Sequence, residues 1–94
     1  MVRRHVHVMA EYGDTFPVWD RTPGSDGGPI DPDKAGLSQQ LVGDLVAWNA
    51  QWEVLVVESS GTVQERSEWE REGRSLAKRV AHEVGGGVRV TYQP

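Results

Sequence analysis

Two histidines near the start of the chain are the residues whose spacing could bind a metal ion. His5 and His7 alternate with Val6 and Val8, and residues i and i+2 of an extended strand project from one face about 7 Å apart. Glu11 has the same parity and could add an oxygen ligand. Alternating polar residues on a solvated strand give the same pattern, so we predict no metal cofactor. A metal-binding protein or metal-dependent enzyme that uses this face remains the alternative.

Other residues with catalytic side chains do not form a recognisable constellation. An enzyme needs a nucleophile or an acid–base pair gathered in a pocket, and the aspartates here occupy positions that turn chemistry already explains. The glycine run at 85–87 follows a predicted helix instead of opening one, so it does not have the strand–loop–helix order of a phosphate-binding loop. We therefore predict a non-enzymatic protein with no catalytic residue.

The distribution of charge indicates a protein partner. The net charge is −4, and residues 11–58 hold nine acidic against two basic side chains. Such a surface repels phosphate backbones and attracts a basic protein, although solubility alone would also explain it. We predict partner-binding carboxylates in this region, with Trp19 as a candidate anchor because tryptophan is enriched in binding hot spots; core burial is the preferred alternative for Trp19. The predicted carboxylates are Asp26, Asp31, Asp33 and Asp44.

These side chains must be positioned by a central helix over residues 37–55. Its apolar residues recur at intervals of four and three, which places them on one helical face, and Ser38 is a suitable N-cap. Propensity opposes the helix at the β-branched run 54–57, so we expect it to end near residue 55. The stripe contains Leu41, Leu45, Trp48, Trp52 and Leu55.

A second helix is predicted to start at a capping box, in which Thr62 and Glu65 satisfy free N–H groups, and to end at the glycine run 85–87. Gly73 lies on its inner stripe. Because glycine costs about 1 kcal/mol relative to alanine in a helix interior, we expect a close approach there, under an indole. The stripe contains Trp69, Gly73, Leu76, Val80 and Val84.

Strands are predicted at both ends of the chain, over residues 2–12 and 88–92, where apolar and polar residues alternate. Residues 16–19 could add a short edge strand, and the Gly/Pro/Asp-rich segment 20–36 reads as a long loop with one helical turn at Asp31-Pro32. The expected fold class is α+β, in one domain over residues 1–94: strand, long loop, helix, helix, strand. Simple connectivity makes the two terminal strands antiparallel, although the long loop could reverse this.

Two further expectations come from what the sequence lacks and leaves open. There is no cysteine, no secretory signal pattern and no membrane-spanning stretch, which together predict a cytoplasmic protein without disulfides. Two strands alone leave unpaired edges and an uncovered face. A homodimer through the sheet is therefore a third hypothesis, as a structural protein.

A resemblance completes the sequence analysis. The tryptophan and glycine placement in AEYG, PVWD, GLS, AWN, EGR and VRV resembles that of short uncharacterised actinobacterial proteins, some of which are similar to immunity proteins or small antitoxins. It covers most of the chain and implies an inhibitor without assigning any catalytic residue or partner. Our leading hypothesis is a non-enzymatic, immunity-protein-like module that binds a protein through its acidic loop and first helix.

Overall fold

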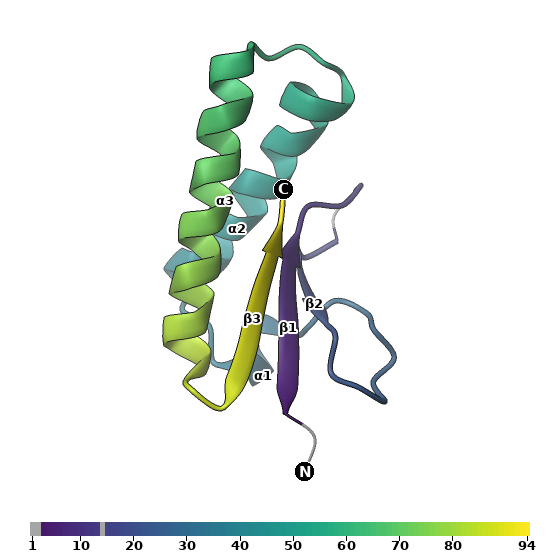
Figure 1. Cartoon of the computed structure of the whole chain (residues 1–94), viewed down its shortest axis with the longest axis vertical. Helices are drawn as coiled ribbons and strands as arrows, with labels where there is room; N and C mark the ends of the chain where they lie inside the picture. Colours follow the sequence, from purple (N-terminus) through teal and green to yellow (C-terminus); the bar gives the residue numbers. More distant parts are fainter. Residues whose placement is uncertain (1–2, 14) are drawn as a thin grey trace.

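A computed structural model describes residues 3–13 and 15–94, in which helices pack against one face of a small sheet (Figure 1). The α+β class and the helices between the terminal strands are confirmed. The elements, in chain order, are β1 (Arg4–Met9), β2 (Val18–Asp20), α1 (Pro32–Ala35), α2 (Gln39–Trp52), the π-helical segment η1 (Glu53–Val57), α3 (Val63–Val84) and β3 (Val88–Gln93).

The sheet has the order β2-β1-β3, so the two chain ends lie side by side (Figure 1). β1 and β3 are parallel, with Val6 opposite Val90, and β2 is antiparallel to β1. The prediction of antiparallel terminal strands was wrong. The chain reverses direction between β1 and β2, between β2 and α2, between α2 and α3, and again between α3 and β3 (Figure 1). Because the number of reversals is even, β3 runs in the same direction as β1. The short edge strand, considered only as an option for residues 16–19, supplies the extra reversal.

The strand boundaries differ slightly from the predicted ones. β1 ends at Met9, three residues before the predicted end at residue 12, and the predicted start at residue 2 lies outside the described residues. β3 extends one residue beyond the predicted 88–92. Within β1, Val6 and Val8 are buried against the helices while His5 and His7 point to the opposite face. The alternation of apolar and polar residues therefore correctly predicted which side chains of β1 face the core.

The core is centred on two tryptophans contributed by facing helices. The rings of Trp48 and Trp69 stack at 4.6 Å between centroids with an interplanar angle of 4°. Each indole N–H donates to the other residue's backbone carbonyl, at 3.0 Å from Trp48 and 2.8 Å from Trp69. Burying an indole without a partner for its N–H costs free energy, and this reciprocal arrangement removes that cost for both. The predicted inward stripes are confirmed at these positions, while Trp52 is only half-buried.

Gly73 lies where α3 comes closest to its neighbours. A Cβ atom at this position would lie 2.6 Å from Cζ2 of Trp48 and 2.5 Å from the Tyr92 hydroxyl oxygen. The predicted close approach under an indole is therefore confirmed, because contacts this short exclude any larger residue unless the rings move.

Local caps set the helix starts as predicted. The Ser38 hydroxyl accepts from the backbone N–H of Leu41, and Asp31 caps the single turn of α1. Thr62 and Glu65 form the reciprocal capping box at the start of α3. None of the helices in the described part of the chain is long and apolar enough to cross a membrane.

The end of the central helix changes its hydrogen-bonding pattern. α2 stops at Trp52, and η1 continues the coil over the β-branched run as a π-helix in which the Glu58 N–H reaches the Glu53 carbonyl at 2.9 Å. The following turn contains Ser59 with φ 54°, a left-handed conformation that is uncommon for residues other than glycine. The predicted helix end near residue 55 falls inside η1.

Candidate protein-binding surfaces

The acidic loop folds as an excursion from β2 that returns to it. The backbone N–H of Asp20 donates to Gly28 at 2.8 Å, and that of Ile30 donates to Val18 at 2.9 Å. The Asp20 carboxylate also accepts from the Thr22 N–H at 2.9 Å, and hydrogen bonding with Thr22 holds the pKa of Asp20 below its ordinary value. The loop therefore has a defined shape although it contains no long regular element.

The three predicted loop carboxylates are exposed, but they do not act alike. Asp31 accepts from the Asp33 N–H at 2.9 Å as the cap of α1, so part of its role is structural. Asp26 and Asp31 line a hollow of about 560 Å³ that also contains Arg4 and Lys34. The charge of this hollow is therefore mixed. Because Asp31 is engaged in the cap of α1, Asp26 and Asp33 are the exposed loop carboxylates best placed to act at a distance.

The other two predicted partner-binding residues have contacts within the protein. Trp19 is half-buried, and its indole N–H donates to the Met9 carbonyl at 3.0 Å while the Arg21 guanidinium lies 5.7 Å from its ring centroid. Asp44 pairs with Arg79 at 2.7 Å between side-chain atoms, across the interface of α2 and α3. Neither residue is a free anchor or a free charge.

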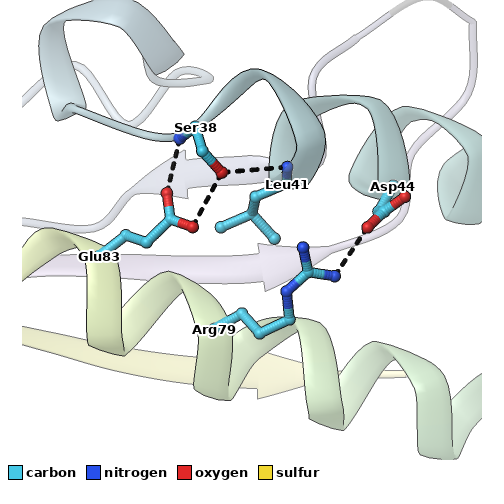
Figure 2. A network of polar contacts seen from close by, with 5 residues as sticks. All are labelled: Ser38, Leu41, Asp44, Arg79 and Glu83. Atoms are coloured by element: carbon cyan, nitrogen blue, oxygen red, sulfur yellow. Dashed lines mark hydrogen bonds and ion pairs between the residues drawn. The ribbon is translucent and has the colours of Figure 1, made fainter.

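Asp44 belongs to a polar network that joins the two helices (Figure 2). Beside its ion pair with Arg79, Glu83 of α3 accepts from the Ser38 N–H at 2.6 Å and from the Ser38 hydroxyl at 2.9 Å. These bonds, led by the one from the Ser38 backbone, hold the pKa of Glu83 below its ordinary value. The network fixes the start of α2 against the end of α3. A structural role therefore accounts for the presence of these side chains.

The histidine face does not assemble the ligand set considered from the sequence. The Thr91 hydroxyl oxygen lies 2.7 Å from Nε2 of His5 and 2.7 Å from Nδ1 of His7. A hydroxyl has one proton, so it donates to one ring nitrogen and accepts from the other. Glu11 lies beyond the strand, where it accepts from the Tyr12 N–H. Over residues 3–13 and 15–94, no three His, Asp or Glu side chains are arranged to hold a metal ion.

Burial lowers the pKa of His7, with a smaller contribution from the positive charge of Arg21, while a hydrogen bond to Gln93 acts in the opposite direction. A neutral ring is therefore favoured in the folded protein. The bridge through Thr91 ties β1 to β3 across the open face of the sheet.

A second acidic surface lies at the η1 end of the molecule, away from α1 (Figure 1). A groove of about 550 Å³ runs between η1 and the first half of α3. Its apolar wall contains Val54, Leu55 and Trp69. The groove also has an acidic rim formed by Glu65, Glu68 and Glu72.

Comparison with known families identifies the chain. Residues 4–94 match the family described as Serratia CdiI immunity protein-like. The chain belongs to this family. The match runs from the start of β1 to the last residue, so it covers the core and both acidic surfaces of this CdiI immunity-protein-like chain. The comparison with curated proteins found no match.

The immunity-protein part of the resemblance drawn from tryptophan and glycine placement is confirmed for this CdiI-like chain. The actinobacterial part stays a prediction. The groove was missed at the sequence level, although two signals pointed to it. Glu65, Glu68 and Glu72 are spaced three and four apart on one helical face, and the β-branched run of η1 opposed the helical pattern.

Proposed function

We propose that this chain is an immunity protein: a non-enzymatic inhibitor that binds a protein toxin and blocks its activity. Membership of the CdiI immunity protein-like family over residues 4–94 is the observation that carries the proposal. The fold supports it, because the sheet, the helices and the two acidic surfaces all lie within the matched residues.

The proposed toxin is basic. The net charge of the chain is −4, and two of its solvent-exposed carboxylates, Asp26 and Asp33, project from the loop segment. Charges on a rim act mainly on the rate of encounter, because they attract an oppositely charged partner over distances longer than a contact. In this proposal the loop draws the toxin in, and Asp44 contributes less because its carboxylate is shared with Arg79.

The function is tested by capture and rescue. An affinity-tagged chain is used to isolate interacting proteins from lysate of the native host, and each captured protein is then expressed alone and together with the chain. We expect one captured protein to arrest growth when expressed alone and to lose this effect when the chain is co-expressed. Persistent growth arrest under co-expression, or binding without any toxic partner, would contradict the proposal.

The loop is tested with a variant that leaves the fold intact. Asparagine is as good an N-cap as aspartate, so Asp31→Asn keeps the cap of α1 while removing its charge. The triple change Asp26→Asn, Asp31→Asn and Asp33→Asn should slow association with the captured toxin at low salt, and the difference from wild type should shrink as salt screens the charges. Equal association rates at low salt would place the steering charges elsewhere.

A further inference from the structure

The groove between η1 and α3 combines exposed apolar surface with an unusual backbone. Val54 is 48 % exposed and lines the groove, and Val56 and Val57 of the same π-helical segment are 36 % and 40 % exposed. A small domain gains nothing in folding from valines that face water, and clustered exposed apolar residues mark interaction sites. The free energy of folding therefore does not explain why this surface is apolar.

The backbone beneath these valines adds to this argument. π-Helical turns are rare and are frequent at functional sites, and here one spans the five residues of η1. It is followed by Ser59 at φ 54° and by Gly61, where a Cβ would lie 2.7 Å from Cδ2 of Leu55. Uncommon conformations of this kind persist where the surrounding structure holds them, and they cluster at binding sites.

The charge of the groove selects the chemistry of its occupant. Three carboxylates rim it, and the described residues that line it include no basic side chain. Glu65 is engaged in the capping box, whereas Glu68 and Glu72 lie one helical turn apart and repel each other. An occupant with positive charges next to apolar side chains complements both the carboxylates and the apolar wall of the groove.

We propose that the groove docks a segment of the toxin in which apolar side chains are flanked by lysine or arginine. This inference rests on the proposed function and names the surface that holds the partner. A second copy of the chain is a poor occupant, because it would bring carboxylates against carboxylates. The loop charges steer the encounter, and the groove supplies the desolvated apolar contact that retains the bound toxin.

The probe is a synthetic amphipathic helical peptide of lysine and leucine, about 15 residues long so that it can hold a helix. It is titrated into the full chain labelled with ¹⁵N, and amide shifts are followed by NMR. We expect the largest shifts over residues 50–55 and 65–72, because the lining of the groove comes from these two segments. A peptide of glutamate and leucine is the control and should not bind.

Two double variants that remove the same amount of negative charge test whether peptide binding depends on the groove or only on the overall negative charge of the protein. Glu68→Gln with Glu72→Gln should weaken peptide binding about tenfold, since two partly screened ion pairs contribute on this order. Asp26→Asn with Asp33→Asn should change it by less than about twofold, because this pair lies at the loop. Glu65 is left unchanged to preserve the capping box.

A matched pair of valines tests the apolar contact without altering charge. Val54→Ser should weaken peptide binding, whereas Val46→Ser should not, because Val46 is 52 % exposed but lies outside the groove. Against the captured toxin, the Glu68/Glu72 variant should mainly raise the dissociation rate and the Asp26/Asp33 variant should mainly lower the association rate.

Several results would overturn the groove proposal: no peptide binding, shifts centred on residues 24–35, equal weakening by both double variants, or equal effects of the two valine changes. Toxin binding and growth rescue would then still support the proposed function, with a different surface. Conversely, the peptide could dock specifically in the groove while the chain rescues growth from none of the captured proteins. That result would support the groove as a binding site and contradict the proposal that its partner is a toxin.

Discussion

Replacing Gly73 with alanine should destabilise the protein, whereas the same change at Gly43 should stabilise it. Both glycines lie inside helices, where alanine is favoured by about 1 kcal/mol. Apart from the neighbouring backbone of its own helix, no atom of the described residues lies within 4 Å of a Cβ added at Gly43, so the intrinsic gain of about 0.5–1 kcal/mol should appear in full. Gly43 is thus a control for helix propensity.

At Gly73 the packing outweighs that gain. The added Cβ would lie 2.6 Å from Trp48 Cζ2, 2.5 Å from Tyr92 Oη and 2.7 Å from Tyr92 Cε1. The Trp48 ring is stacked on Trp69 and bonded to its carbonyl, and the Tyr92 hydroxyl donates to the Glu70 carbonyl at 2.8 Å. Moving either ring by the required distance disturbs these contacts.

Overpacking a core costs about 1–3 kcal/mol, and a lost hydrogen bond costs about 1 kcal/mol more. After subtracting the propensity gain, we expect Gly73→Ala to lower the free energy of unfolding by about 1–3 kcal/mol relative to wild type. The two alanine variants should therefore differ by about 2–4 kcal/mol. For a domain of this size each kcal/mol corresponds to about 4–8 °C in Tm.

The assay is denaturant unfolding followed by tryptophan fluorescence, with thermal unfolding by circular dichroism as a second measurement. Adding Tyr92→Phe to Gly73→Ala removes the contact with the hydroxyl and leaves the contact with Cε1, so the double variant should show coupling between the sites but only partial recovery. If Gly73→Ala raised the midpoint as much as Gly43→Ala, the close packing of α3 against Trp48 and Tyr92 would be refuted.

Three further predictions concern the core, the histidine face and the oligomeric state. Trp48→Ala should lower the free energy of unfolding by about 3–5 kcal/mol, against little change for the exposed Arg74→Ala, and similar denaturation midpoints would contradict the helix-face assignment. His7 has a lowered pKa in the folded protein because burial favours its neutral ring, so the unfolded chain binds more protons just below the ordinary pKa of about 6.5. Stability should therefore fall as the pH decreases below about 6.5, and His7→Gln should reduce this dependence in denaturation midpoints measured from pH 5 to 8. The homodimer stays a prediction: β3 is an edge strand, so pairing between two copies should raise the sedimentation coefficient with concentration, and a constant monomer value would argue against it.

Prediction of the functional surfaces from sequence was weaker than prediction of the fold. Asp26, Asp31 and Asp33 are exposed as expected of loop carboxylates, but the sequence did not show that Asp44 pairs with Arg79, a residue 35 positions away. The histidine pair likewise meets Thr91 from the other end of the chain. These contacts form because segments far apart in the sequence pack together, and a local sequence pattern holds no information about such packing.

The sequence alone determined what depends on near neighbours. The caps at Ser38 and Thr62, the inward stripes around Trp48 and Trp69, and the alternation in β1 are all fixed within a few residues by helix and strand geometry. Even the close approach at Gly73 could be predicted, because a glycine on the inner face of a helix lowers helix stability, and close packing is the reason to expect it there.

Tertiary structure decided the direction of β3, the π-helical end of α2 and the acidic groove beside it. Direction follows from the number of chain reversals, and a three-residue strand such as β2 adds one reversal with almost no sequence signal. The groove exists because η1 and α3 meet without filling the space between Val54 and Glu72. Each of these features depends on how separate elements pack, and packing is a property of the folded chain as a whole.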